Sequence, residues 1–280
     1  MAETFAGLDL AQPIVMGIIN VTPDSFSDGG EAFDPAQAVQ RGRDMVASGA
    51  DILDIGGEST RPGASPVSID EEIRRVVPVI EALSGCGAVI SIDTRHPDVM
   101  VAAARAGTGI INDVTALTHD DRSVEVVSEL GLPVVLMHMQ GNPEDMQAAP
   151  SYENAPVEVR DYLASRVETC VDAGIARENI AVDPGIGFGK ALEHNLQILN
   201  RIELLREIAG PVVLGVSRKS FIAKVCGEED PQKRVPGSLA AAVLARQQGV
   251  QIFRVHDVEE TVQALSITDA ITGAISGHEL

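Results

Sequence analysis

Aromatic residues are scarce in this chain, which contains no tryptophan, two tyrosines and six phenylalanines among 280 residues. The 45% of residues that are hydrophobic are therefore mostly aliphatic, and the core must be built from Val, Ile, Leu and Ala. A chain of this length has enough apolar material for a sizeable core. The aliphatic mixture is typical of parallel strands whose faces are covered by helices.

Basic residues are also few. The chain has 21 Lys and Arg against 41 Asp and Glu, which gives a formal net charge of −20. A surface with this charge repels nucleic acid and anionic lipid, so we expect neither as a partner. A local cationic pocket is still possible, and an anionic small-molecule substrate would require one.

Cysteines and long apolar runs are scarce too. The three cysteines, Cys86, Cys170 and Cys226, are odd in number and lack CxxC spacing, which argues against a disulfide framework and against a zinc site. The N-terminal Met1-Ala-Glu-Thr has neither a basic nor an apolar signal region. No segment has the roughly eighteen apolar residues that a membrane span needs. We therefore expect a cytoplasmic protein with no membrane partner.

Eight short runs rich in Val and Ile predict strands, and a polar residue lies at or beside the end of each. The runs are Ile14–Ile19, Ile52–Ile55, Ala88–Ile92, Gly109–Ile111, Pro133–Met137, Ile180–Val182, Val212–Val216 and Gln251–Val255. The polar residues are Asn20, Asp54, Asp93, Asn112, His138, Asp183, Ser217 and His256. The carboxyl ends of parallel strands share one edge, so these side chains are expected at a common rim.

The segments between these runs have apolar residues at helical spacing, and glycines follow several of them as at C-caps. Helices are expected over residues 36–46, 73–80, 99–106, 122–130, 157–173, 192–208, 239–248 and 258–275. Eight alternations of strand and helix predict an α/β fold, a closed (β/α)8 TIM barrel with its active site at the C-terminal rim. We expect one domain over residues 1–280, with a short N-terminal extension over 1–12. A doubly wound sheet would show a dinucleotide fingerprint, and none follows the first strand.

The segment Asp183-Pro-Gly-Ile-Gly-Phe-Gly-Lys190 follows the predicted strand Ile180–Val182. A short β-branched run that ends on a carboxylate and then breaks into glycines places that carboxylate at the rim. Three glycines in five positions let the backbone pass close to a flat ligand. Two other strand-to-helix loops, residues 20–33 and 56–67, are long enough to act as lids or binding loops, although they could also be plain connections.

The polar rim residues fall into two chemical groups. Asp93, Asn112 and Asp183 suit the donor edge of a flat nitrogen heterocycle. Arg61, Lys219, Arg254 and His256 suit an anion. A pocket that is acidic on one side and basic on the other indicates a bifunctional ligand, with a heterocycle at one end and phosphate at the other.

Several of these residues also have a purely structural interpretation. Asp93 could cap the following helix, and Asp54 is more simply a structural partner than a ligand. His138 is more simply a satisfied core or rim histidine, and Lys219 could form a solvated pair with Arg218, although its place after a predicted strand argues otherwise. The remaining histidines are expected at the surface; these are His96, His119, His194 and His278.

Eight segments, in order along the chain, carry a resemblance to the dihydropteroate synthase family. They are Gly17-Ile-Ile-Asn-Val-Thr-Pro-Asp-Ser-Phe-Ser-Asp-Gly-Gly30, Asp54-Ile-Gly-Gly-Glu-Ser-Thr-Arg-Pro-Gly63, Ser91-Ile-Asp-Thr94, Ile111-Asn-Asp113, Met137-His-Met-Gln-Gly141, Asp183–Lys190, Gly215-Val-Ser-Arg-Lys219 and Arg254-Val-His256. The match runs from about residue 14 to residue 258, and the first two motifs are highly specific.

The resemblance implies an enzyme, a transferase of folate biosynthesis. It would condense 6-hydroxymethyl-7,8-dihydropterin diphosphate with p-aminobenzoate to give 7,8-dihydropteroate and diphosphate, and sulfonamides would mimic p-aminobenzoate. Asp28, Lys219, Arg254 and His256 would be catalytic, with Asp28 helping to stabilise a pterin cation. The implied pterin-binding residues are Asp93, Asn112, Asp183, Phe188, Gly215, Lys219 and Arg254.

The resemblance also implies the other subsites. Asn20, Arg61, Arg254 and His256 would surround the diphosphate, with the cofactor Mg²⁺ bound through Asn20. The implied p-aminobenzoate site comprises Phe26, Thr60, Pro62, Lys219 and Ser220. Small-molecule substrates and a homodimer are the implied partners.

Three other functions stay open at the level of sequence. A pterin-binding methyltransferase barrel would share the acidic pterin edge but would have no use for a diphosphate site. A non-catalytic pterin binder would keep the fold without turnover, although both long loops are intact by pattern. A Schiff-base aldolase would use Lys219 as its nucleophile.

Overall fold

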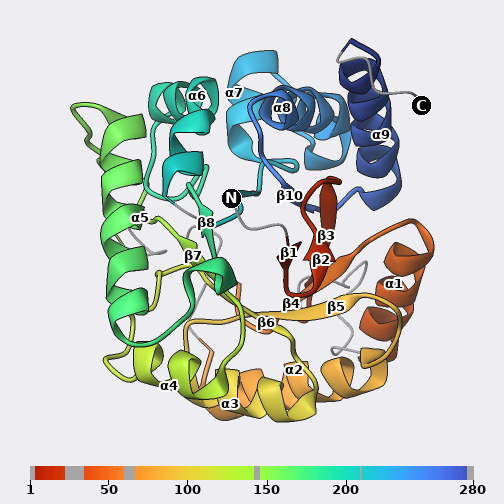
Figure 1. The fold of residues 1–280 in the computed structure, drawn as a ribbon. Coiled ribbons are helices and arrows are strands. Elements are labelled where there is room, and N and C mark those ends of the chain that lie inside the picture. The colour runs from red at the N-terminus through yellow and green to blue at the C-terminus, as the bar shows by residue number, and fades with distance from the viewer. Residues whose placement is uncertain (1–3, 23–34, 60–66, 142–145, 209, 276–280) are drawn as a thin grey trace.

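Eight parallel strands form a nearly closed barrel inside a ring of helices, as the (β/α)8 prediction required (Figure 1). The computed structural model describes residues 4–22, 35–59, 67–141, 146–208 and 210–275. The order of neighbouring strands is β8-β7-β6-β5-β4-β3-β10-β9, so the chain adds each strand beside the previous one. A parallel bridge between Val182 and Val212 joins β8 to the segment that leads into β9, and this bridge brings the two edges together.

The barrel strands lie close to the predicted runs. They are β3 (Ile14–Asn20), β4 (Ile52–Gly56), β5 (Val89–Asp93), β6 (Ile110–Asp113), β7 (Val134–Met137), β8 (Ile180–Asp183), β9 (Val213–Leu214) and β10 (Ile252–Val255). The helices are α1 (Pro35–Ala47), α2 (Ile69–Leu83), α3 (Pro97–Ala106), α4 (Ser123–Leu130), α5 (Ala155–Asp172), α6 (Leu192–Asn200), α7 (Ser220–Cys226), α8 (Val235–Gln247) and α9 (Val258–Ile275). Short 3₁₀ turns cover Arg177–Asn179, Ile202–Glu207 and Pro231–Arg234.

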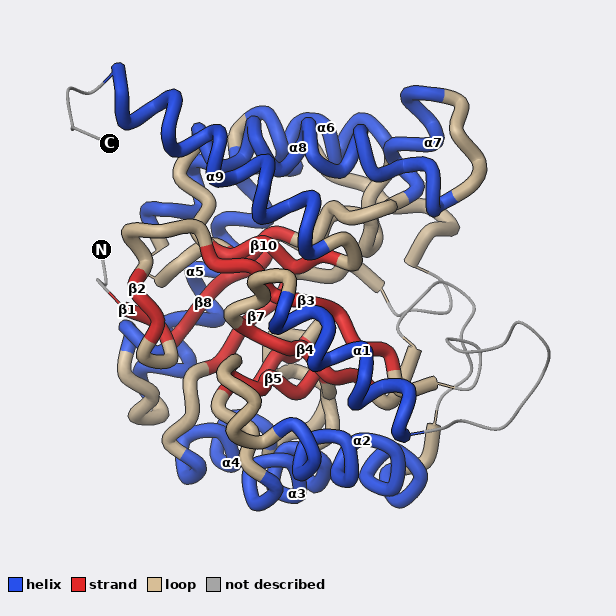
Figure 2. Tube along the Cα trace, turned by 90° about the vertical axis from the view of Figure 1, so that its right-hand side faces the viewer, coloured by secondary structure: helices blue, strands red, loops and turns tan. Residues whose placement is uncertain are grey.

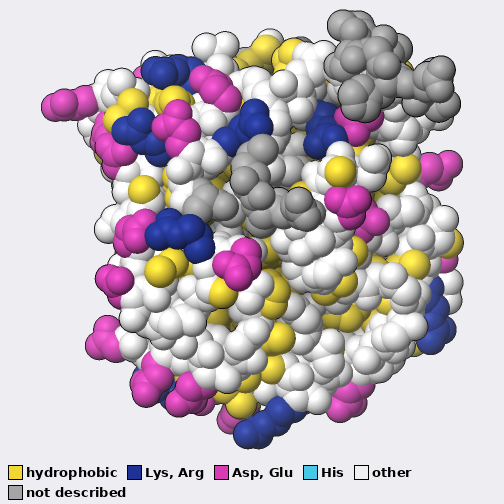
Figure 3. Space-filling model, viewed as in Figure 1, with side chains coloured by type: hydrophobic (Ala, Val, Ile, Leu, Met, Phe, Trp, Pro, Cys, Tyr) yellow, Lys and Arg dark blue, Asp and Glu magenta, His cyan; other side chains and the backbone are white. Residues whose placement is uncertain are grey.

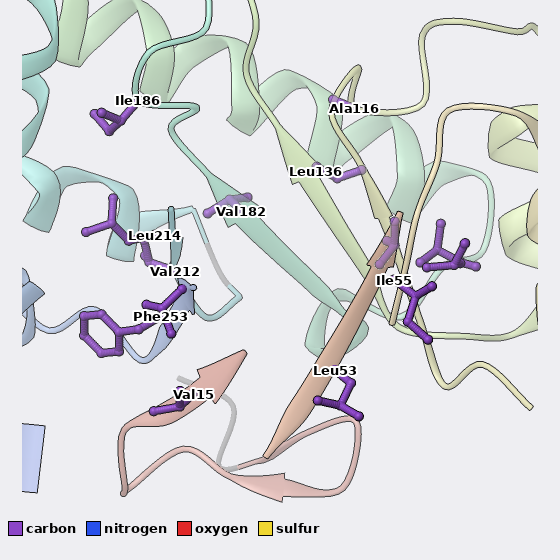
Figure 4. Packing of buried hydrophobic residues seen from close by; sticks show 14 of the residues in the cluster. Val15, Leu53, Ile55, Ala116, Leu136, Val182, Ile186, Val212, Leu214 and Phe253 are labelled. Carbon is purple, nitrogen blue, oxygen red and sulfur yellow. The ribbon is translucent and has the colours of Figure 1, made fainter. Parts of the chain in front are cut away.

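Side chains alternate between the two faces of each strand, and this alternation separates two hydrophobic clusters. One set points outward and packs under the helices; it includes Val15, Leu53, Ile55, Leu136, Val182, Leu214 and Phe253 (Figure 4). The other set points into the barrel and comprises Ile14, Met16, Ile52, Ile110, Val135, Ala181, Val213 and Ile252, together with Phe5 and Leu10. The half of the barrel interior nearer the N-terminal ends of the strands is therefore filled by apolar side chains, and we call this layer the apolar floor.

A hairpin near the N-terminus completes this floor. Strands β1 (Thr4–Phe5) and β2 (Leu8–Asp9) are antiparallel, and Phe5 is only 1% exposed in contact with the inner cluster. Figure 2 shows the hairpin at one end of the barrel, with α7 towards the other end. The hairpin lies within residues 1–12, a segment for which the sequence pattern predicts no element.

Three further elements differ from the sequence prediction. The predicted strand Val212–Val216 is reduced to β9, Val213–Leu214. The predicted helix 192–208 ends at Asn200 and continues as a 3₁₀ turn over Ile202–Glu207. Helix α7, Ser220–Cys226, has no predicted counterpart, because seven residues are too few to show a helical period.

One face of the surface shows how the charged side chains are distributed. On the face drawn in Figure 3, acidic and basic side chains are interspersed and form no continuous patch of one sign. None of the helices that the structure describes is long and apolar enough to cross a membrane.

Candidate active site

A polar layer lies inside the barrel directly above the apolar floor. The strand alternation that turns Ile52 and Ile110 inward also turns inward the residues two positions later, Asp54 and Asn112. The same periodicity turns inward Ser91 of β5, Asp183 of β8 and Arg254 of β10. Strand periodicity and the stagger of the barrel thus bring five polar side chains together above the floor.

Asp54 is the centre of this layer. It is fully buried, and its Oδ1 accepts a hydrogen bond from Ser91 Oγ at 2.6 Å. Its Oδ2 accepts from Asn112 Nδ2 at 3.0 Å and from Arg254 Nε at 2.6 Å. These bonds use the acceptor capacity of the carboxylate, so the prediction of a structural partner is confirmed. The Asn112 amide is oriented by Asp54, which leaves its oxygen as an acceptor.

Asp93 pairs with the same arginine. Arg254 Nη2 lies 2.7 Å from Asp93 Oδ2, so one guanidinium bridges two carboxylates. Burial raises the pKa of Asp93 to about 7, against the opposing charge of Arg254 and with further elevation from Asp54. Burial alone would lower the pKa of Arg254, but the two carboxylates outweigh this effect and raise the pKa above its usual value. The N-cap of α3 is His96, so Asp93 does not cap the next helix.

The side chains of Asp183, Lys219 and Arg254 converge beside Gly215. Because glycine has no side chain, the space between them is not filled. A Cβ placed on Gly215 would lie 3.6 Å from Lys219 Nζ, 3.9 Å from Arg254 Cβ and 4.0 Å from Asp183 Oδ2. The backbone N–H of Gly185 donates to Asp183 Oδ1 at 2.7 Å, which fixes the carboxylate and leaves Oδ2 towards the common space. The structure therefore brings the predicted Asp183, Gly215, Lys219 and Arg254 together.

Lys219 is half-buried and directed across the pocket, so the solvated pair with Arg218 is not formed. Its Nζ donates to the Ile186 carbonyl oxygen and lies 4.8 Å from the centre of the Phe188 ring. Burial lowers the pKa of Lys219 to about 8, although the nearby Asp183 carboxylate opposes this effect. Phe188 is half-buried beside this amine, so its aromatic ring lies next to Lys219.

The glycine-rich loop after β8 is held by a buried lysine that our sequence interpretation did not assign. Lys190 is 1% exposed, and its Nζ lies 2.9 Å from His138 Nδ1, from the Gly185 oxygen and from the Phe188 oxygen. A Cβ at Gly185 would collide with the His138 carbonyl oxygen, so only glycine fits there. His138 is therefore a satisfied rim histidine, as expected. The terminal lysine of the glycine-rich segment was the available signal for this clamp.

His256 lies on the other side of Arg254. Burial, Arg254 and Arg218 together lower the pKa of His256 to about 3, so the ring is neutral. Its Nδ1 lies 3.1 Å from Ser217 Oγ, and its backbone N–H donates to the same oxygen at 3.2 Å. Since the backbone N–H occupies a lone pair of that oxygen, the Ser217 hydroxyl can donate to Nδ1 and leave Nε2–H as a donor for a ligand. Ser217 was predicted at the rim without a role.

The other expected surface histidines are not all exposed. His194 is buried, where its Nδ1 accepts from the backbone N–H of Ala191, so the prediction for this residue was wrong. His96 is also mostly covered, while His119 is exposed as predicted. His278 lies outside the described residues.

Asn20 ends β3 at the rim, half-buried, with its side chain free of hydrogen bonds to other residues in the described ranges. No group of three or more His, Cys, Asp or Glu suited to a metal occurs among the described residues. Mg²⁺ commonly uses one or two protein oxygens together with substrate phosphates and water. A free amide oxygen at the rim fits that mode of binding.

The remaining predicted site residues divide into two groups. Ser220 is exposed and begins α7, directly after Lys219. Five predicted residues lie outside the described ranges, and these are Phe26, Asp28, Thr60, Arg61 and Pro62.

Comparisons with known proteins agree with this geometry. The family described as "Pterin binding enzyme" matches residues 16–256. Dihydropteroate synthase of Escherichia coli is 48% identical over 268 residues, with 95% of this chain and 94% of that protein covered. The structure is similar to a Yersinia pestis dihydropteroate synthase–sulfonamide complex, with a TM-score of 0.90, 47% identity and coverage of 95% and 96%. It is also similar to the Xanthomonas albilineans enzyme with 7,8-dihydropteroate, with a TM-score of 0.85, 44% identity and coverage of 95% and 95%.

Proposed function

The chain belongs to the pterin-binding enzyme family and catalyses the dihydropteroate synthase reaction, and we propose that its polar barrel layer binds the pterin while Arg254 and His256 bind the diphosphate. The reaction joins 6-hydroxymethyl-7,8-dihydropterin diphosphate to p-aminobenzoate and releases diphosphate. It belongs to folate biosynthesis. The main support for this division of the site is that Asp183, Lys219 and Arg254 lie together beside Gly215.

The acceptors and donors of the pocket match the two edges of a pterin. Asp183 Oδ2 and the Asn112 oxygen accept from the amino and ring N–H groups of the pyrimidine edge, and Asp93 completes this acidic side. Lys219 donates to the oxygen and nitrogen of the opposite edge. Gly215 has no side chain, which leaves room for the flat ring. The aromatic ring of Phe188 offers a surface against which the pterin can pack.

The cationic side of the pocket accepts the diphosphate. Arg254 is anchored by Asp54 and Asp93, so its guanidinium is preorganised rather than mobile. The Nε2–H of neutral His256 donates to a phosphate oxygen, and we assign Arg61 to the same subsite. Asn20 would hold Mg²⁺ against the diphosphate, where the ion would neutralise charge on the leaving group.

Diphosphate departs with the bonding electrons of the carbon–oxygen bond, which leaves a cation on the pterin methylene. The p-aminobenzoate nitrogen attacks this carbon and loses its proton afterwards, so no strong base is required. We propose that Asp28 stabilises the cation and that Phe26, Thr60, Pro62, Lys219 and Ser220 form the p-aminobenzoate site. The Yersinia relative binds a sulfonamide drug, and we propose that sulfonamides occupy the same site here.

The test is an assay of diphosphate release on mixing both substrates with Mg²⁺. Release that requires p-aminobenzoate supports the condensation, and the pteroate formed should equal the diphosphate released. Pterin binding without release would indicate a non-catalytic binder, and a borohydride-trapped adduct at Lys219 would indicate an aldolase. A methyltransferase barrel would bind pterin with no preference for the diphosphate ester.

We also propose a homodimer that forms through α8 and α9. Leu244 on α8 and Ile267 and Ile271 on α9 are 59%, 59% and 57% exposed. The two helices pack together and are joined by an ion pair between Arg246 and Asp269. These exposed apolar side chains on two packed helices, called the α8–α9 patch below, support an interface. The cytoplasmic location expected from the sequence stays a prediction.

A further inference from the structure

Arg41 is a half-buried arginine on α1 outside the strand-end motifs, and it is near enough to His256 and Asp257 for their charges to interact. The buried side of α1 includes Met45, which is one turn after Arg41. Met45 packs on Gly17 of β3 and beside the start of α9. A Cβ placed on Gly17 would meet Met45 Sδ at 2.8 Å and Val258 Cγ2 at 3.3 Å.

The strand register shows where Arg41 lies along the barrel axis. Gly17 is paired with Val255 of β10, so Met45 lies at the level of Val255. A barrel helix runs back along its preceding strand, so one turn towards the helix N-terminus is about 5.4 Å towards the C-terminal rim. Arg41 therefore lies at the level of His256 and Asp257, between β3 and β10.

Arg41 has no hydrogen bond or ion pair with another residue of the described part of the chain. The nearby carboxylate, Asp257, is occupied by Arg218, which approaches it with Nε at 3.0 Å and with a second contact through Nη2. Burial lowers the pKa of Arg41, and the charge of Arg218 lowers it further, while Asp257 acts in the opposite direction. The guanidinium is thus partly desolvated, beside another cation and without a bound acceptor in the described ranges.

Among the residues that the structure describes, the cationic groups around His256 exceed the carboxylates left available to them. Arg218 occupies Asp257, and Arg254 occupies Asp54 and Asp93. The charges of Arg254, Arg218 and Arg41 all disfavour protonation of His256. A bound anion would relieve this excess, and a partly buried cation gains most from such a partner.

We propose that Arg41 is a further anion-binding residue of this site and contacts the phosphoryl group of the diphosphate that lies farther from the pterin. The inference rests on the proposed diphosphate subsite and adds a residue from α1 to it. From the pterin pocket outward, the anion would meet Arg254, then His256, then Arg41. A guanidinium in this position would hold the diphosphate before and after cleavage of the carbon–oxygen bond.

The competing explanation is that Arg41 only balances the charge of Asp257. In that case its removal would lower stability and would affect all ligands equally. Arg43, two residues along the same helix, is exposed and provides a matched control for the loss of one positive charge.

The experiment compares Arg41→Gln, Arg41→Lys and Arg43→Gln with the wild-type enzyme. Titration calorimetry with inorganic diphosphate and Mg²⁺, and with a pterin that lacks phosphate, measures the two affinities separately. We expect Arg41→Gln to weaken diphosphate binding about tenfold or more, the loss of one charge-assisted hydrogen bond, without changing pterin affinity. Arg41→Lys should recover part of the loss, and Arg43→Gln should match the wild type. The KM for the pterin diphosphate should rise more than kcat falls.

The possible outcomes separate this inference from the proposed function. Diphosphate binding in Arg41→Gln equal to that of the wild type would overturn the role of Arg41 and leave the proposed function intact. An equal loss for pterin and diphosphate would also overturn it, because it would show a structural role. Failure of the wild-type enzyme to bind or release diphosphate would refute the proposed function itself. If Arg41→Gln does not fold, the titration of Arg41→Lys decides. A diphosphate affinity equal to that of Arg43→Gln and the wild type would contradict direct contact through the guanidinium group.

Discussion

In the proposed site, a single residue can combine a structural contact with a ligand contact, and Asp183 is the example. Its Oδ1 accepts the Gly185 N–H, and its Oδ2 faces the space beside Gly215. Asp183→Asn keeps an oxygen for Gly185 but removes the charge that we propose binds the pterin edge. Because hydrogen bonds to a charged group contribute about 1.5–3 kcal/mol each, we expect pterin affinity to fall at least tenfold. Calorimetry with pterin measures this, and unchanged affinity in a variant with native circular dichroism would contradict the pocket assignment.

Lys219 should produce a pH limit on the alkaline side. Its pKa of about 8 lies below that of an ordinary lysine, chiefly because the amine is buried. The charged donor is therefore present below pH 8 and is lost as the pH rises through that value. We expect kcat/KM for the pterin diphosphate to fall above about pH 8 and this limb to move well beyond pH 9 in Lys219→Arg, because arginine stays protonated. A profile with the same alkaline limb in both proteins would assign it to another group.

A buried carboxyl group outside the pocket gives a prediction about stability. Glu72 of α2 is 0% exposed, and neither carboxylate oxygen has a hydrogen-bond partner among the described residues. Burial raises the pKa of Glu72 to about 7, and the nearby Thr94 hydroxyl offsets this only in part. A raised carboxyl pKa means that the folded state binds more protons than the unfolded state between about pH 4.5 and 7, so stability falls as the pH rises through this window.

Glu72→Gln should remove that penalty. We compare the free energy of unfolding of the variant with that of the wild type at pH 5 and at pH 8. The difference in favour of the variant should be larger at pH 8, by at most about 3 kcal/mol, since one pKa unit corresponds to about 1.4 kcal/mol. Urea unfolding at the two pH values measures the difference. Glu71→Gln is the control on the same helix turn, because Glu71 is paired with Arg74 and Arg75 and has a lowered pKa. An equal response in both variants would contradict the assignment to Glu72.

At the scale of elements, the sequence predicts the barrel strands well because each is short, β-branched and followed by a polar rim residue. The inward direction of Asp54, Asn112 and Asp183 follows from the same two-residue period. The missed elements have physical causes. Strand β9 was predicted but is shorter than its apolar run, with two residues, and helix α7 has seven residues, too few for a periodic signal. The bonds of Lys190 to His138 and to loop carbonyls depend on tertiary contacts that no local pattern contains.

The N-terminal hairpin was also missed, and its contribution can be measured. Phe5 packs into the apolar floor, whereas Thr4 on the same strand is exposed. We expect Phe5→Ala to cost about 3–5 kcal/mol of unfolding free energy, as for other buried phenylalanines. Thr4→Ala should change stability little. Because the hairpin and the polar layer lie at opposite ends of the barrel interior, KM for both substrates at low temperature should stay near the wild-type value. A large rise in KM without loss of stability would contradict this separation.

For the whole molecule, the net charge of −20 opposes association while the apolar patch on α8 and α9 favours it. Two like-charged chains repel over a distance of about 10 Å at 0.1 M salt, and added salt screens that repulsion. We therefore expect the proposed dimer to become tighter as sodium chloride rises from low to moderate concentration.

Ile267→Asp tests the same balance directly. It places a charge in the proposed interface and adds to the repulsion, so the protein should become monomeric in light scattering at micromolar concentration. Leu196→Asp on α6 adds the same charge at a residue that is 42% exposed but outside the α8–α9 patch, and this variant should stay dimeric. Both variants should retain pterin binding, because neither residue approaches the polar layer. A wild-type protein that is monomeric at every salt concentration would refute the homodimer, and dissociation caused equally by both substitutions would place the interface elsewhere on the helical ring.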